Sequence, residues 1–332
     1  MANDHTSADA SRIAIRRRWK LITVLALVIT GAVLMRLIPD DAVASHRLKM
    51  NAAAGPAVPA APFMNIWTDR PVMLVGIGDS VTRGFGTSAD HSYFARLEKN
   101  PDDEFREMKR KCLSVVLPNL TSRNLSMSGS TSLHCMTELK RLPKQKPATM
   151  GIVVMTTGGN DLIHNYGRGP IEEGAMYGAT FQAAQKWIGN YRKRLNRVFD
   201  TIDGKFPGGC HIFIANIYDP TDGRGDIEKS GLGLPRWRDG LKIHAAYNKV
   251  IKESAAARAN THLVDMHAAF LGHGIHYRER RSKHYRAADP TYWYFNNFED
   301  PNDRGYDAIR RIFLLEIIRF HAEFGERNHV QK

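Results

Sequence analysis

A serine lies directly after an apolar stretch of the chain, in the segment of residues 72–80 that ends Gly78-Asp79-Ser80. Gly78 allows a tight bend after a buried strand, so Ser80 is expected at the carboxyl end of that strand, where open α/β sheets bind ligands. A serine hydroxyl at such a place is suited to nucleophilic attack on a carbonyl carbon. An ordinary strand-to-helix turn can have the same local sequence, so the Gly-Asp-Ser triplet alone does not establish a catalytic site.

Two later segments carry further residues of the types that this chemistry needs. Residues 124–130 read Asn-Leu-Ser-Met-Ser-Gly-Ser, and residues 156–161 read Thr-Thr-Gly-Gly-Asn-Asp. Together with Ser80, they resemble the first three sequence blocks of the SGNH, or GDSL-type, hydrolases. The resemblance implies that Ser80 is the nucleophile, that Gly129 supplies a backbone N–H and that Asn160 supplies a side-chain N–H. Such preorganised donors stabilise the negative charge that develops on an ester oxygen, which predicts a serine esterase with an acyl-Ser80 intermediate.

The fourth block departs from the family pattern, which is Asp-x-x-His-Pro-Asn-x-x-Gly. The matching residues here are 297–305, Asn-Phe-Glu-Asp-Pro-Asn-Asp-Arg-Gly. Asp300 therefore takes the place of the histidine, and Asn297 takes the place of the aspartate. A serine needs a base whose pKa is near the working pH, and an unperturbed carboxylate with a pKa near 4 is a weak base unless burial raises that pKa. This block therefore does not identify the catalytic base.

A substitute histidine is available in the chain before this block, at residues 270–276 and at His284. We expect a structural role for His273, because related lipases carry a similar Gly-His stretch beside a separate catalytic histidine. His276 is the first choice for the base, with Glu299 or Asp300 orienting its imidazole as the third member of a triad. The predicted catalytic residues are Ser80, Gly129, Asn160, His276 and Asp300.

Strand-like and helix-like segments alternate along the chain beyond residue 67. Such alternation predicts a parallel sheet covered by helices on both faces. The expected fold is therefore a three-layer α/β/α sandwich with a central parallel sheet, flavodoxin-like and similar to that of the SGNH hydrolases. The predicted strands are 73–77, 151–156, 211–217 and 262–266, and the predicted helices are 181–200, 241–258 and 306–324.

The N-terminal part has the pattern of a membrane anchor. A basic cluster at residues 16–20 precedes an apolar run at residues 21–35, so the positive-inside rule predicts a cytoplasmic N-terminus and an extracytoplasmic catalytic domain. Cleavage near Ala44 is the alternative and would make the domain periplasmic or secreted. The predicted divisions are a basic N-terminus at 1–18, a signal anchor at 19–38, an Ala/Pro-rich linker at 39–66 and the hydrolase domain at 67–332.

Composition and motif content argue against nucleic-acid binding and against a metal or cofactor site. The net charge is +13, yet no zinc-finger spacing or RNA-recognition signature is present, so nucleic acid is not an expected partner. Three cysteines, Cys112, Cys135 and Cys210, allow at most one internal disulfide. The acidic segment 216–226 lacks the distal glutamate of a calcium loop, and no metal or cofactor is expected.

The expected substrate is a small-molecule ester, or an ester of a lipid or of an envelope glycan, and the sequence does not specify the oligomeric state. Two alternatives remain open. An acyltransferase would share the first half-reaction, and a binding protein on the same scaffold would have lost turnover together with the Asp-x-x-His pair.

Overall fold

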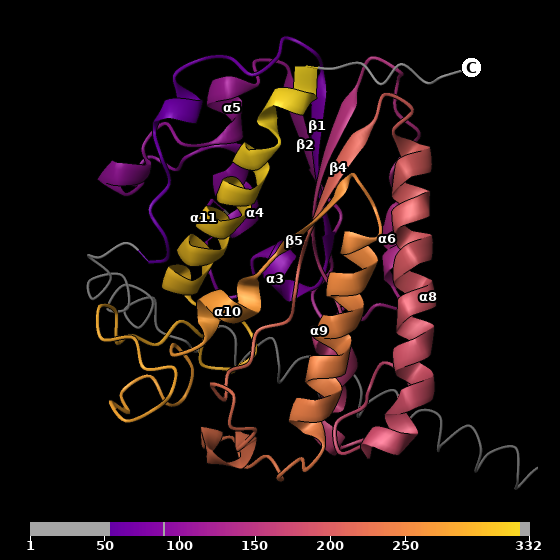
Figure 1. Cartoon of the computed structure of the whole chain (residues 1–332), viewed down its shortest axis with the longest axis vertical. Helices are drawn as coiled ribbons and strands as arrows, with labels where there is room; N and C mark the ends of the chain where they lie inside the picture. The colour runs from indigo at the N-terminus through magenta and orange to yellow at the C-terminus, as the bar shows by residue number, and fades with distance from the viewer. Residues whose placement is uncertain (1–53, 89, 326–332) are drawn as a thin grey trace, which may run out of the picture. The chain divides into compact units, whose positions relative to one another are not determined.

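The computed structural model describes residues 54–88 and 90–325, which contain a five-stranded parallel sheet in the order β2-β1-β3-β4-β5 (Figure 1). The order places β3 at the centre and β2 and β5 at the edges. The strands are β1 (Val72–Gly78), β2 (Leu120–Asn124), β3 (Met150–Thr156), β4 (Cys210–Ala215) and β5 (Thr261–Val264).

Strand burial follows the composition of each segment. Every residue of β3 is buried, as expected for a central strand with both faces covered. The edge strand β2 has the sequence Leu-Thr-Ser-Arg-Asn, and its residues are alternately half-buried and exposed. It has no apolar run, which explains why the sequence predicted the other four strands and not this one.

Helices cover both faces of the sheet, which confirms the predicted three-layer sandwich (Figure 1). On one face α8 packs against α9, with the rings of Tyr191 and Tyr247 stacked 4.3 Å apart between centroids. On the other face α4 packs against α11, where Tyr93 stacks on Phe313 at 4.9 Å. The helices named here are α4 (Tyr93–Glu98), α6 (Cys135–Lys140), α8 (Phe181–Lys205), α9 (Gly240–Ala256) and α11 (Asp303–Arg319).

Shorter helices occupy the connections. Three of the α-helices directly follow strands at the carboxyl edge of the sheet, namely α3 after β1, α7 after β3 and α10 after β5. The short elements are η1 (Ala61–Phe63), α3 (Ser80–Arg83), η2 (Arg106–Met108), α5 (Leu113–Val116), α7 (Gly159–Ile163), η3 (His164–Gly167), η4 (Ile227–Ser230), α10 (Met266–Phe270) and η5 (His321–Gly325).

The strand order reverses next to β1, because the chain adds β2 on one side and then crosses to β3 on the other. Loops that leave β1 and β3 therefore diverge, and such a switch point is where open α/β sheets bind ligands. Ser80 follows β1, and Asn160 lies four residues after the last residue of β3. The topology thus brings two of the predicted catalytic residues to one crevice.

The folded unit begins before the predicted boundary at residue 67. Ala54 and Val58 are only 1% and 4% exposed, and the Ala54 N–H donates to Asp307 Oδ2 at 3.1 Å. Residues 54–66 are therefore part of the domain, because their apolar side chains pack on its core. The remainder of the predicted linker and the predicted anchor at 19–38 lie outside the described residues. Among the described helices, none has the length and apolar character needed to cross a bilayer.

Candidate active site

The turn that carries Ser80 is fixed by its neighbours. Gly78 has φ of 127°, and a Cβ atom there would lie 1.8 Å from the Thr156 carbonyl oxygen, so no other residue fits without moving β3. Asp79 then caps α3, because its Oδ1 accepts a hydrogen bond from the Val81 N–H at 3.1 Å. Ser80 is the first residue of α3 and is partly exposed. Its hydroxyl is thus accessible on a rigid turn.

A chain of buried hydroxyl groups leads to Asp79. The Thr156 hydroxyl donates to Asp79 Oδ1 at 2.7 Å, and Thr82 and Tyr93 continue the chain through contacts of 2.7 Å each. Because the Thr156 hydroxyl donates its proton to Asp79, the Thr82 hydroxyl donates to Thr156, and the Tyr93 hydroxyl donates to Thr82. Burial raises the pKa of Asp79 to about 7, although the Thr156 hydrogen bond opposes the rise. The network fixes the nucleophile turn to β3 and to α4.

The two predicted oxyanion donors lie in the same pocket as Ser80. Gly129 and Asn160 both line it, and Asn160 Nδ2 donates one hydrogen bond to the Ser130 carbonyl oxygen at 2.9 Å. An amide nitrogen carries two protons, so the second N–H remains for a ligand. Gly129 has φ of 77° and no atom within 4 Å of the position that a Cβ would take, so its backbone borders open space.

Glu138 connects the nucleophile turn to the loop of Gly129. This carboxyl group is completely buried, and its Oε2 accepts the Gly78 N–H at 2.8 Å while its Oε1 accepts the Ser130 hydroxyl at 2.5 Å. Burial raises its pKa, and these hydrogen bonds lower it. One side chain from α6 therefore sets the spacing between the attacking oxygen and the oxyanion donors.

Asp300 lines the Ser80 pocket together with Asn297. Asn297 Nδ2 donates to Asp300 Oδ2 at 2.6 Å, and Asn297 Oδ1 accepts the Asp300 N–H at 3.1 Å. Burial raises the pKa of the Asp300 carboxyl, and hydrogen bonding by the Ser80 hydroxyl and by Asn297 lowers it in part. Asp300 Oδ1 is buried and has no well-aligned hydrogen-bond partner among the described residues. Asp300 and Ser80 line the same pocket, and Asn297 donates a hydrogen bond to Asp300.

The segment before Asp300 is held in an uncommon conformation. Phe298 has φ of 71°, which is rare for a bulky side chain and costs roughly 1–3 kcal/mol. The next residue, Glu299, accepts a hydrogen bond from the Tyr166 hydroxyl, and its backbone oxygen accepts one from Tyr218. These contacts hold the segment against the pocket and keep Asp300 beside Ser80.

The structure does not bring His276 to Ser80, which corrects the prediction that it is the base. Its Nε2 contacts Asp226 Oδ1 at 2.9 Å and its Nδ1 contacts Glu279 Oε1 at 2.5 Å. Both ring nitrogens are engaged by carboxylates, so neither nitrogen is directed at Ser80. His276 instead joins two loops.

His273 and His284 are also placed away from the nucleophile. His273 stacks on Trp293 with ring centroids 3.5 Å apart, and its Nδ1 contacts the Thr291 carbonyl oxygen at 2.9 Å. Burial lowers its pKa to about 4. This packing agrees with the structural role expected for His273. His284 lies beside Gly223, and neither of these histidines lines the pocket of Ser80.

Two features of the site were missed by the sequence. His164, in η3, lines the Ser80 pocket, and the only signal for it was its position four residues after Asn160. Glu138 gave no signal, because it lies in an ordinary helical segment 60 residues from Gly78 along the chain. Only the fold shows that either residue belongs to the site.

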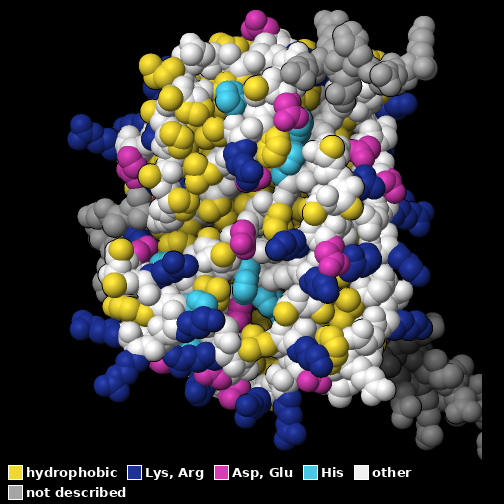
Figure 2. Space-filling view, in the orientation of Figure 1, with side chains coloured by type: hydrophobic (Ala, Val, Ile, Leu, Met, Phe, Trp, Pro, Cys, Tyr) yellow, Lys and Arg dark blue, Asp and Glu magenta, His cyan; other side chains and the backbone are white. Residues whose placement is uncertain are grey.

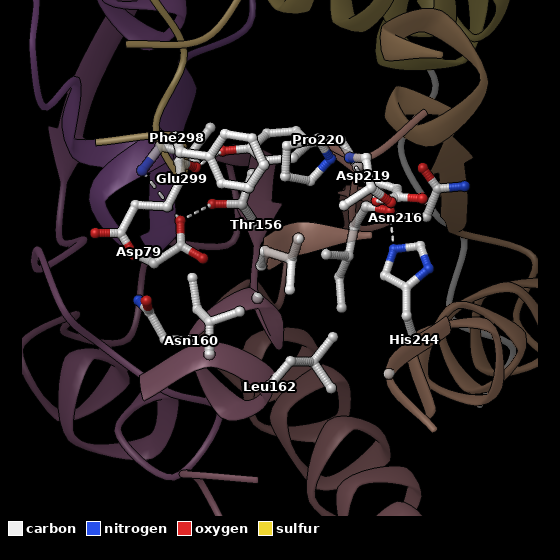
Figure 3. Close-up of a pocket in the computed structure, with 18 of the residues that line it drawn as sticks. Asp79, Thr156, Asn160, Leu162, Asn216, Asp219, Pro220, His244, Phe298 and Glu299 are labelled. Atoms are coloured by element: carbon white, nitrogen blue, oxygen red, sulfur yellow. Dashed lines mark hydrogen bonds between the residues drawn. The ribbon is translucent and has the colours of Figure 1, made fainter. Parts of the chain in front are cut away.

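A second, mainly apolar pocket extends from Ser80 along the carboxyl edge of β3 and β4 (Figure 3). It encloses about 1040 Å³, counting space open to solvent. Asp79 and Asn160 lie near one end and His244 near the other, with Leu162 between them in Figure 3. The apolar lining includes Leu162, Ile163, Ile217, Ile227, Trp237, Leu241, Met266 and Phe298.

The model of the GDSL-like Lipase/Acylhydrolase family matches residues 77–308. The chain belongs to this family. The match includes Ser80, Gly129, Asn160 and the departing segment that carries Asp300, and membership supports an esterase-type activity. A comparison with curated protein sequences gives no significant match.

Solved structures of several hydrolases are similar to this family member. An acetylxylan esterase from Geobacillus stearothermophilus is 17% identical, with a TM-score of 0.45 over 76% of this chain and 96% of that chain. An extracellular lipase from Streptomyces rimosus is 16% identical, with a TM-score of 0.46 over 74% and 98% of the two chains. A lipolytic protein of the G-D-S-L family from Veillonella parvula is 13% identical, with a TM-score of 0.43 over 75% and 97%.

Proposed function

We propose that this protein is a serine esterase in which Asp300, oriented by Asn297, is the general base for Ser80. One observation carries the proposal: Ser80, both oxyanion donors and the Asn297-Asp300 pair line a single pocket. A nucleophile, a base within reach of it and a third group that orients the base are the parts that covalent ester hydrolysis requires.

The reaction has two half-reactions with the same groups. In the first, the Asp300 carboxylate takes the Ser80 proton, Ser80 Oγ attacks the ester carbonyl carbon, and the N–H groups of Gly129 and Asn160 hold the oxyanion. The intermediate collapses when Asp300 returns the proton to the departing alcohol, which leaves acyl-Ser80. In the second, Asp300 takes a proton from water, the hydroxide attacks the acyl carbon, and Ser80 recovers its proton as the acid leaves.

Burial is what makes a carboxylate useful in this role. A base works best when its pKa is near the working pH, and desolvation raises the pKa of Asp300 from the ordinary range of an aspartate. Burial is also the main reason why the pKa of the neighbouring Asp79 carboxyl is raised, and the negative charge of Asp300 raises that pKa further. Low solvent access therefore compensates in part for the absent imidazole.

The apolar pocket supports an acyl group as its occupant. It opens directly from Ser80, and its surface is formed mainly by carbon atoms, so an acyl chain would lose contact with water on binding. We further propose, on the basic cluster at 16–20 and the apolar run at 21–35, that the enzyme acts outside the cytoplasmic membrane. A reporter enzyme fused to the C-terminus, active only on one side of the membrane, tests this location.

Hydrolysis of p-nitrophenyl butyrate by the full-length protein tests the activity, together with covalent labelling by a fluorophosphonate. We expect both signals in the wild type, neither in Ser80→Ala, and a loss of turnover in Asp300→Asn. Absence of turnover and labelling in the wild type would favour a binding protein instead, because the Asp-His pair of the family is replaced here. Product formation that rises with an added alcohol would identify an acyltransferase with the same acyl-Ser80 intermediate.

A further inference from the structure

One arginine of α8 is largely buried against the loop that carries Gly129. On the face shown in Figure 2, most Lys and Arg side chains project from the molecular surface, where water solvates their charge. The Arg194 side chain is only 15% exposed, whereas that of Arg192, two residues earlier in α8, is 43% exposed. Burying a cation is costly unless it is paired and hydrogen-bonded, so the partners of Arg194 indicate its role. We call residues 128–132, which contain Gly129, the oxyanion loop.

Arg194 connects a carboxylate to the oxyanion loop. Its Nη1 donates to Glu173 Oε1 at 2.7 Å, and its Nε donates to Ser132 Oγ at 3.0 Å. Its Nη2 has no hydrogen-bond partner among the described residues and lies 3.7 Å from Asp161 Oδ1. Glu173 is held in turn by Asn190 Nδ2 at 2.8 Å, from the preceding turn of α8. The guanidinium group therefore lies between two carboxylates, and its Nε is aimed at Ser132.

Asp161 holds the same loop to the residue that follows Asn160. Its carboxyl group is completely buried, its Oδ2 accepts the Ser132 N–H at 2.7 Å, and its Oδ1 accepts the Ser132 hydroxyl. Asn160 Nδ2 donates to the Ser130 carbonyl oxygen at 2.9 Å. Because Asn160 and Asp161 are consecutive, one turn of α7 holds the loop at two points. These contacts set the distance between the backbone N–H of Gly129 and the amide of Asn160.

Arg194 determines the direction of the hydrogen bond between Ser132 and Asp161. The guanidinium group can only donate, so Ser132 Oγ accepts from it and the Ser132 proton goes to Asp161. Burial raises the pKa of Asp161, while the two Ser132 hydrogen bonds and the charge of Arg194 lower it. Without Arg194 the carboxylate would lose its cation, and a proton taken up by Asp161 would weaken one of its two contacts with Ser132.

Resting on the proposed function, we propose that Arg194 is a positioning residue for ester hydrolysis, acting through Ser132 and Asp161 on the two oxyanion donors. Arg194 lines neither of the two pockets beside Ser80, so it has no contact with the reacting atoms. The N–H groups of Gly129 and Asn160 bind the ester oxygen more strongly once it is charged. Displacing them therefore raises the transition state more than the bound ester, and lowers kcat more than it raises KM.

Steady-state kinetics of the full-length protein with p-nitrophenyl butyrate test this role. Loss of a whole oxyanion donor costs about 10² to 10³-fold, and displacement of a donor should cost less. We expect Arg194→Met to lower kcat about 30-fold and to change KM by less than about twofold. Arg194→Lys keeps the charge and should be intermediate. The matched control, Arg192→Met, removes an exposed ion pair with Glu253 from the same helix and should keep the wild-type kcat.

A double-mutant cycle separates this role from a general effect on packing. If Arg194 acts through the Ser132 hydroxyl, then Arg194→Met and Ser132→Ala remove the same coupling. The double variant should then be slower than the slower single variant by no more than about threefold, whereas independent losses would multiply. The inhibition constant of 1,1,1-trifluoro-2-hexanone, whose adduct with Ser80 carries an oxyanion, should rise by the factor by which kcat/KM falls.

Three results would overturn the inference. They are a kcat in Arg194→Met within about twofold of the wild type, an equal loss in Arg192→Met, and losses that multiply in the cycle. If Arg194→Met does not fold, as judged by its melting transition, the cycle is run with Arg194→Lys and Ser132→Ala and is read in the same way.

The proposed function and this inference can fail separately. Hydrolysis that requires Ser80 and persists unchanged in Arg194→Met would keep the esterase and remove the role of Arg194. If the wild type does not hydrolyse esters, amide hydrogen exchange of a peptide that contains residues 128–132 measures the anchoring of the oxyanion loop without turnover. Faster exchange in Arg194→Met than in Arg192→Met would support the anchoring, and equal exchange in the two variants would refute it.

Discussion

Replacing Asn297 and Asp300 together should convert the carboxylate base into an Asp-His pair. Asn297 Oδ1 accepts the backbone N–H groups of Glu299 and Asp300 at 3.3 and 3.1 Å, so its Nδ2 must point at the side chain of residue 300. In the single variant Asp300→His, that N–H would donate to Nδ1 of the new imidazole. The ring proton would then lie on Nε2, facing Ser80, and the ring could not accept the serine proton.

The double variant Asn297→Asp/Asp300→His reverses this tautomer, because a carboxylate at 297 accepts the Nδ1 proton and leaves Nε2 bare. An equivalent tautomer error costs serine proteases about 10⁴-fold in turnover, or about 5 kcal/mol of transition-state stabilisation. We therefore expect the double variant to exceed the single variant by about 10³ to 10⁴-fold in kcat/KM for p-nitrophenyl butyrate. Its pH profile should gain a limb near the usual histidine pKa of about 6.5.

The refuting results are specific. Equal rates in the single and double variants would show that residue 297 does not orient the base. An Asp300→Asn protein with wild-type kcat/KM would show that Asp300 takes no proton from Ser80, and loss of activity in His164→Ala would then assign the base to His164, which lines the same pocket.

Three further predictions concern the groups around the nucleophile. The Asp79 carboxyl has a pKa of about 7 in the folded protein and of 3.8 in the unfolded chain. Its protonated form therefore stabilises the fold fully below pH 3.8, and this stabilisation, at most about 4 kcal/mol, is lost as the pH rises to about 7. Asp79→Asn should therefore raise the melting temperature at pH 8 and not at pH 4, and a rise of the same size at both pH values would contradict this. Glu138→Ala should lower kcat about 100-fold with little change in KM, because the oxyanion donors lose their spacing. Glu138→Gln should retain most of kcat, because its amide can accept a hydrogen bond from the Gly78 N–H and donate one to the Ser130 hydroxyl. His276→Ala should lower the melting temperature but keep fluorophosphonate labelling of Ser80, and a loss of labelling in a folded protein would restore His276 as a candidate base.

The resemblance to the family pointed to Ser80, Gly129 and Asn160, and the structure brings these three residues to one pocket. Ser80 and Asn160 follow apolar runs that form β1 and β3, and strands of a parallel sheet present their carboxyl ends at one edge. Local sequence pattern also predicted the helices α8, α9 and α11. The boundary at residue 67 was misplaced, because alanine and proline in a sequence do not reveal whether the segment packs on a core.

The choice of base lay beyond the sequence. Residues 271–302 form a long connection without regular periodicity, and the sequence alone does not show which of its acids and histidines approaches Ser80. The structure shows which of these groups lie near Ser80: Asp226 and Glu279 hold His276 away from it, while Asp300, hydrogen-bonded by Asn297, lines the Ser80 pocket. Glu138 reaches Gly78 across 60 residues for the same reason. The amino-acid sequence determined the ends of the apolar strands by local propensity, and its resemblance to the family pointed to Ser80. Tertiary packing alone decided which polar groups meet there, because burial and long-range hydrogen bonds depend on the assembled fold.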